Sequence, residues 1–186
     1  MPKIVIISSS IRKGRNSDRV ALFFRNFINE NKLANAEIID LADSEFPLFN
    51  ERLKFQDNPS VKAKIFAEKI RLSDGVIIIS PEYNGGYPAS LKNVIDLLTD
   101  EWARKPVAIC TVSSGDFGGS QVLIPLQFTL WKMKAWTIPS VFPVPRVEDS
   151  FDEKGLPANK DFDEKRASHF ISELLWYIEA RKRMDQ

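Results

Sequence analysis

Gly75-Val76-Ile77-Ile78-Ile79-Ser80 is the most strand-like segment of the sequence, and it runs directly into Pro81. A continuous apolar, β-branched run of this length is typical of a strand buried on both faces, as in a parallel sheet. Similar runs predict buried strands at residues 3–8 and 106–112, and extended segments at residues 36–41 and 136–144 complete the set. The prolines in residues 136–144 favour an edge position for that strand, because proline cannot donate to a neighbouring strand.

Segments with helical periodicity lie between and after these strands, each with apolar side chains on one face. They are residues 20–28, 63–70, 91–98, 123–133 and 167–178. Pro125 is expected to bend the first turns of the fourth helix. Strand–helix alternation repeated five times predicts an α/β fold, a five-stranded parallel sheet with helices on both faces. The chain has 186 residues and no linker-like segment, so we expect a single domain over residues 1–186.

Composition and charge exclude several functions. There are 26 basic and 25 acidic residues, a formal net charge of +1, so nothing indicates a nucleic-acid partner. The single cysteine, Cys110, excludes an intrachain disulfide framework and a cysteine-based zinc site, and no metal-ligand spacing is present. No apolar run approaches a membrane span, and residues 4–7 are too few for a signal peptide. We therefore expect a cytoplasmic protein with no membrane partner.

The loop after the first predicted strand, residues 8–17, has the composition of a phosphate site. It combines hydroxyl groups, cations and a glycine just before a helix, where free backbone N–H groups favour an anion. The candidate phosphate ligands are Ser10, Arg12, Arg15, Asn16 and Ser17. The alternative is ordinary helix capping by Asn16 or Ser17 beside solvated arginines. Neither the P-loop spacing nor the Gly-x-Gly-x-x-Gly fingerprint is present.

Two further loops, residues 80–88 and 113–120, follow the third and fourth predicted strands. In a parallel sheet of this kind the ligand lies beyond the carboxyl ends of the strands, where all three loops converge. Glycine permits close backbone approach, and a tyrosine with an amide would suit a flat heteroaromatic ring. The candidate ring contacts are Pro81, Glu82, Tyr83, Asn84, Gly85, Ser114, Gly115 and Gly118. Asn84-Gly85 alone could also be an ordinary turn.

Other chemically capable side chains are expected to have no role in the site. His169, the only histidine, lies off the apolar stripe of the last helix and is interpreted as a surface residue. Cys110 is interpreted as a small buried hydrophobe. Asp40 ends the second predicted strand and, without a glycine fingerprint, is interpreted as a cap or loop residue. The four tryptophans are expected in the core or at subunit contacts.

Three motifs on these loops resemble the NAD(P)H-dependent FMN reductase family, which includes azoreductases and quinone or chromate reductases. They are Ser10-x-Arg12-x-Gly14-Arg15-x-Ser17, Pro81-Glu82-Tyr83-Asn84 with Leu91-Lys92-Asn93-x-Ile95-Asp96, and Gly115-x-x-Gly118-Gly119. The segments 151–155 and 173–177 are similar to the last part of the family's chain. The resemblance implies a flavodoxin-like fold, FMN phosphate on the first loop and the isoalloxazine on the other two. It also implies a homodimer or homotetramer.

The expected function is an FMN-dependent oxidoreductase. It would take hydride from NADPH or NADH and pass electrons to a small acceptor, such as free flavin, a quinone, an azo compound or a metal oxyanion, by a ping-pong mechanism. The chemistry would occur at flavin N5, so no catalytic side chain is predicted. One alternative is a flavodoxin-like electron carrier, which the near-neutral charge disfavours; the other is a flavin-free binding or signalling module on the same fold. The role of residues 46–55, as active-site lining or subunit contact, stays open.

Overall fold

The computed structural model describes residues 1–43 and 46–185. Its centre is a five-stranded sheet in the order β2-β1-β3-β4-β5, with every neighbouring pair parallel. This is the strand order of flavodoxin-like folds, and it confirms the predicted parallel sheet. The strands are β1 (Lys3–Ser8), β2 (Asn35–Asp40), β3 (Gly75–Pro81), β4 (Pro106–Val112) and β5 (Trp136–Val144).

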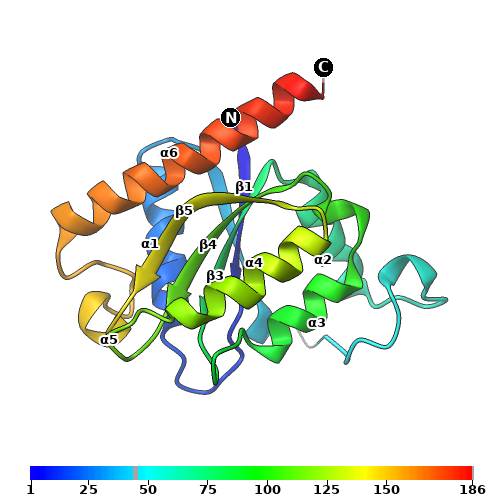
Figure 1. Cartoon of the computed structure of the whole chain (residues 1–186), viewed down its shortest axis with the longest axis horizontal. Helices are drawn as coiled ribbons and strands as arrows, with labels where there is room; N and C mark the ends of the chain where they lie inside the picture. The colour runs from blue at the N-terminus through cyan, green and yellow to red at the C-terminus, as the bar shows by residue number, and fades with distance from the viewer. Residues whose placement is uncertain (44–45, 186) are drawn as a thin grey trace.

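Helices cover both faces of the sheet, as predicted (Figure 1). The apolar faces of α1 and α6 pack on one side, in a cluster that contains Phe24, Phe142 and Phe170. The apolar faces of α2, α3 and α4 pack on the other side, around Phe66 and Trp102. The α-helices are α1 (Ser17–Glu30), α2 (Val61–Leu72), α3 (Ala89–Leu97), α4 (Leu123–Lys132), α5 (Val147–Ser150) and α6 (Lys160–Met184). Short 3-10 turns are η1 (Leu41–Asp43), η2 (Leu53–Phe55), η3 (Asp100–Trp102) and η4 (Ser120–Val122).

The prolines fit this architecture without disrupting it. β5 is an edge strand, as predicted, and its register against β4 shifts between Val107 and Ile109, where Pro139 lies on the β5 side. A bulge at an edge is a position that proline tolerates. Pro125 is the third residue of α4. The first amides of a helix have no intrahelical acceptor, so proline costs no hydrogen bond there, and the structure gives no reason for the expected bend.

The strand order determines where a ligand can bind. From β1 the chain moves to β2 on one side of it and later to β3 on the other side. The loops after β1 and β3 therefore leave the sheet in different directions and open a crevice at its carboxyl edge. Within the described residues no helix is long and apolar enough to cross a membrane.

Candidate functional site

A pocket of about 230 Å³ lies at the carboxyl ends of β1, β3 and β4. Most of the residues predicted to bind a cofactor line it together: Ser10, Arg12, Arg15, Asn16, Ser17, Pro81, Glu82, Tyr83 and Ser114. They come from three loops separated by 24 residues or more in the sequence. The structure therefore brings together the three loops that the sequence singled out.

The start of α1 is open toward this pocket. The Asn16 side chain makes no capping bond to the helix, and its amide instead donates to Glu148 Oε1 at 2.7 Å. Ser17 is only 2% exposed, and its Oγ has no hydrogen-bond partner within the described protein. A buried hydroxyl without a partner is costly, and a phosphate oxygen at the helix N-terminus would satisfy it. Ordinary capping, the alternative interpretation of this loop, is therefore not what the structure contains.

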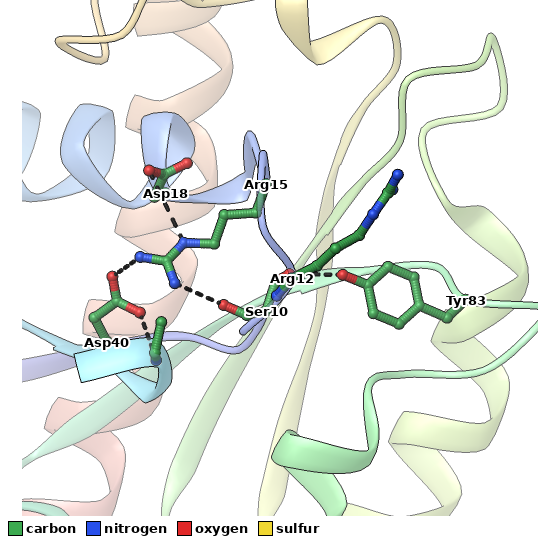
Figure 2. A network of polar contacts seen from close by, with 7 residues as sticks. Ser10, Arg12, Arg15, Asp18, Asp40 and Tyr83 are labelled. Atoms are coloured by element: carbon green, nitrogen blue, oxygen red, sulfur yellow. Dashed lines mark hydrogen bonds and ion pairs between the residues drawn. The ribbon is translucent and has the colours of Figure 1, made fainter. Parts of the chain in front are cut away.

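The two arginines of the first loop have different surroundings. Arg12 is exposed on the pocket wall and pairs with no carboxylate in the described part of the chain. Arg15 also lines the pocket, but its guanidinium is bonded to Asp40, as Figure 2 shows. Asp40, expected to be a cap or loop residue, is the last residue of β2, and its Oδ1 accepts from Ala42 N at the start of η1, as a capping side chain does. Its Oδ2 is in addition the ion-pair partner of Arg15. Of the two arginines, Arg12 is thus the one that lines the pocket without a carboxylate partner among the described residues.

Tyr83 connects two of the loops. Its hydroxyl and that of Ser10 are hydrogen-bonded at 2.6 Å, and the same Ser10 Oγ accepts a bond from Arg12 N at 3.3 Å (Figure 2). The ring of Tyr83 therefore extends from the end of β3 to the loop after β1, which carries the candidate phosphate ligands. This contact places the tyrosine hydroxyl beside Ser10, one of the predicted phosphate ligands.

Four of the predicted ring contacts lie outside the pocket wall. Asn84 and Gly85 have φ values of 53° and 79° and form a tight turn closed by paired bonds between Tyr83 and Gly86. An Asn-Gly hairpin turn has this pattern, with both residues in the left-handed region of backbone conformation. Gly118 is buried, and a Cβ there would lie 2.9 Å from Pro143 Cβ, so it serves close packing against β5. Gly115 is exposed with open space beside it.

Sequence reasoning missed two pocket residues on α5. Val147 and Glu148 line the pocket because Val147 N donates to Ser113 O and Arg146 N donates to Gly115 O, which attaches α5 to the third loop. The segment after β5 carries no periodic pattern or glycine signal. Only the pairing of β5 beside β4 brings it to the site.

The segment from Phe46 to Phe49 is attached to the molecule by Asn93, a residue of the Leu-Lys-Asn motif. Asn93 Oδ1 accepts from Phe49 N at 2.6 Å, and its Nδ2 donates to Pro47 O at 2.9 Å. Phe46 and Leu48 line an apolar cavity of about 460 Å³ on the α3 side of the first loop. The segment therefore borders a cavity next to the site, although it is absent from the polar pocket.

Two of the side chains expected to have no role in the site, His169 and Cys110, lie away from the pocket. His169 is exposed on α6, and Cys110 is fully buried in β4, where burial raises the pKa of its thiol. Such a thiol is not activated as a nucleophile. Among residues 1–43 and 46–185 no group of His, Cys, Asp and Glu side chains could hold a metal ion.

Comparison with known proteins shows the family to which the chain belongs. The sequence model of the family described as NADPH-dependent FMN reductase matches residues 2–149. An NAD(P)H-dependent FMN reductase of Schizosaccharomyces pombe is 31% identical over 144 residues, covering 75% of this chain and 71% of the relative. A quinone reductase of Escherichia coli K12 is 34% identical over 123 residues, which are 64% of each chain.

Among solved structures, the flavoenzyme NAD(P)H:(acceptor) oxidoreductase FerB of Paracoccus denitrificans superimposes with a TM-score of 0.78. The match covers 97% of this chain and 98% of that one, at 20% identity, and it confirms the flavodoxin-like fold. The family match spans the three motifs from which the resemblance was inferred, and it confirms that resemblance. The chain belongs to the NADPH-dependent FMN reductase family and is an oxidoreductase.

Proposed function

We propose that this chain is a single FMN-binding domain that takes hydride from NADPH or NADH and passes electrons to a small acceptor by a ping-pong mechanism. The acceptor classes are those expected from the sequence: free flavin, a quinone, an azo compound or a metal oxyanion. Family membership favours this enzyme over a flavodoxin-like carrier and over a flavin-free module. The quinone reductase among its relatives supports a quinone as the first acceptor to test.

The observation that carries the proposal is the buried Ser17 hydroxyl at the start of α1, which has no hydrogen-bond partner among residues 1–43 and 46–185. A phosphate placed there would meet a hydroxyl donor, free backbone N–H groups and the exposed Arg12 in one pocket. These groups fit the phosphate of FMN. The same pocket holds no set of groups that would act as a nucleophile with its base.

The flavin, when bound, supplies the hydride and electron chemistry. The residues of this chain would position it: Arg12, Ser10 and Ser17 at the phosphate, and the backbone of the loops at residues 81–85 and 114–118 at the ring. Glu82 and Asn84 stay predicted ring contacts, together with Gly115. Their backbone groups can donate and accept at the ring edge without contributing an acid or a base.

Titration with FMN tests the proposal directly. The purified protein should be yellow or should change the absorbance and fluorescence of added FMN. A colourless protein that leaves both signals unchanged would contradict it. Initial rates of NADPH oxidation at several quinone concentrations should then give parallel double-reciprocal lines, whereas intersecting lines would require both substrates to be bound together.

We also propose a homodimer formed through α4. Ile124, Phe128 and Trp131 lie on one face of this helix at spacings of four and three residues, and each is more than half exposed. Large apolar side chains gathered on one helix face are typical of subunit interfaces. Light scattering at micromolar protein should give about twice the 21.2 kDa of the chain.

We place the activity in the cytoplasm. One buried cysteine needs no oxidising compartment, which is consistent with that assignment. Cell fractionation with an antibody to the protein tests it, and recovery in a membrane or secreted fraction would contradict it.

A further inference from the structure

Arg15 connects three separate segments of the chain. Its Nη1 donates to the backbone oxygen of Ser10 at 3.1 Å, and its Nη2 is bonded to Asp40 Oδ2. Its Nε lies 4.0 Å from Asp18 Oδ2 on α1. The other oxygen of Asp40, Oδ1, accepts from Ala42 N at 3.0 Å, which fixes the carboxylate to the backbone after β2 (Figure 2).

Both partners of this ion pair are largely shielded from water. The side chains of Arg15 and Asp40 are 18% and 17% exposed. Burial is the main influence on Asp40 and raises the pKa of its carboxyl, against the lowering effects of the Ala42 amide and of Arg15. The desolvation of such a pair offsets much of its attraction, so its main contribution is to fix geometry.

The pair fixes the conformation of the loop after β1, which carries the candidate phosphate ligands. Arg15 holds the carbonyl of Ser10, and the hydroxyl of the same serine bonds Tyr83 and the backbone N–H of Arg12. The path from Asp40 to the backbone N–H of Arg12 thus passes through Arg15 and Ser10, with hydrogen bonds on either side of the serine. A guanidinium suits this task because two of its nitrogens can bind Ser10 O and Asp40 at the same time.

We propose that Arg15 and Asp40 are a positioning pair that acts on the FMN phosphate through Ser10 and Arg12, without direct contact between Arg15 and the phosphate. The inference rests on the proposed function. It gives a role to Asp40, at the end of β2 on the far side of the first loop. The pair thereby sets the preference for FMN over riboflavin, which has the same ring and no phosphate.

The test measures dissociation constants of FMN and riboflavin for the wild type and for Asp40→Asn, Arg15→Met and the double variant. Each single variant should bind FMN about tenfold more weakly, the equivalent of one charge-assisted hydrogen bond, while riboflavin binding stays within about twofold. The double variant should be no worse than either single one, since both changes break the same link. Glu37→Gln is the matched control, because it removes the Lys69–Glu37 ion pair from the same strand, away from the pocket.

If Arg15 bound the phosphate directly, Asp40→Asn would change the FMN affinity in the opposite direction. Removing Asp40 would then free the guanidinium, and Asp40→Asn would bind FMN more tightly. Any of three results would overturn the inference: tighter FMN binding by Asp40→Asn, equal losses of affinity for FMN and riboflavin, or additive losses of FMN affinity in the double variant. If Asp40→Asn does not fold, Arg15→Lys replaces it: the charge is kept, but one nitrogen cannot hold Ser10 O and Asp40 together, so FMN affinity should still fall. A wild type that binds neither flavin would refute the proposed function instead.

Discussion

The hydroxyl groups of Ser10 and Tyr83 lie 2.6 Å apart and join the loop after β1 to the loop after β3. Ser10 comes from the segment that the sequence associates with phosphate, and Tyr83 from the segment associated with the ring. One hydrogen bond therefore couples the two halves of the proposed flavin site.

Tyr83→Phe should weaken FMN binding about three- to tenfold, because a neutral hydrogen bond contributes about 0.5–1.5 kcal/mol and its loss frees the Ser10 hydroxyl. Fluorescence titration measures the effect. Tyr87→Phe is the matched control: Tyr87 and Thr129 share a similar bond of 2.7 Å, directed to α4. Equal losses for the two variants would mean that the Ser10 contact has no special role.

Arg12→Ala should weaken FMN binding about ten- to a hundredfold, since a charge-assisted bond to phosphate is worth about 1.5–3 kcal/mol. Riboflavin affinity should hardly change, and Arg12→Lys should restore only part of the loss, because an ammonium cannot bind two oxygens in one plane. Lys13→Ala removes a neighbouring exposed cation that does not line the pocket. A similar loss for Lys13→Ala would indicate general charge attraction and not a specific contact.

Gly115→Ala should affect flavin binding, whereas Gly119→Ala should affect the stability of the fold. Gly119 has a φ of 70°, and a Cβ there would lie 2.9 Å from Val112 O, so its replacement should destabilise the fold by about 2 kcal/mol or more. Gly115 has open space beside it, so Gly115→Ala should leave the melting temperature unchanged and weaken FMN and riboflavin alike. Thermal unfolding of the apoprotein and flavin titration measure the two effects. A Gly115→Ala variant with normal affinity for both flavins would remove this glycine from the ring site.

Trp131→Glu should convert the proposed dimer to a monomer, because a buried unpaired carboxylate is strongly disfavoured at an apolar interface. Trp176→Glu is the control: Trp176 on α6 is 64% exposed, against 65% for Trp131, but lies on the opposite face of the sheet. Light scattering of both variants against wild type decides the matter. If only Trp176→Glu dissociates the dimer, the interface lies on α6 and not on α4.

Because of Lys105, the free energy of unfolding should change with pH in the alkaline range. Its ammonium is buried against Ser73 O at the end of α2, and burial lowers its pKa from 10.5 to about 8. Between these values the folded protein binds fewer protons than the unfolded chain, so the contribution of Lys105 to stability rises with pH. Relative to Lys105→Met, the wild-type free energy of unfolding should increase by roughly 1.4 kcal/mol per pH unit from about pH 8 to about pH 10.

Urea unfolding at several pH values measures this trend, with Lys64→Met as the control for loss of an exposed lysine on α2. A constant difference between wild type and Lys105→Met over this range would contradict the assignment.

The sheet could be predicted because its signal is local. Val76 to Ile79 form a continuous β-branched run, and the prolines of residues 136–144 mark an edge strand. The convergence of three loops then followed from a general property of parallel sheets. The short helix α5 was missed, because four residues carry no periodicity.

The amino-acid sequence by itself determined the strand–helix alternation, the edge of the sheet at which the three loops converge, and the residue types that suit a phosphate. These depend on patterns within short segments. The tertiary structure alone decided that Asp40 pairs with the guanidinium of Arg15, that Glu148 accepts from the amide of Asn16, and that the Ser17 hydroxyl has no partner among the described residues. The physical reason is that hydrogen-bond partners are chosen by distance in space, and residues 25 and 132 positions apart meet only after the sheet has assembled.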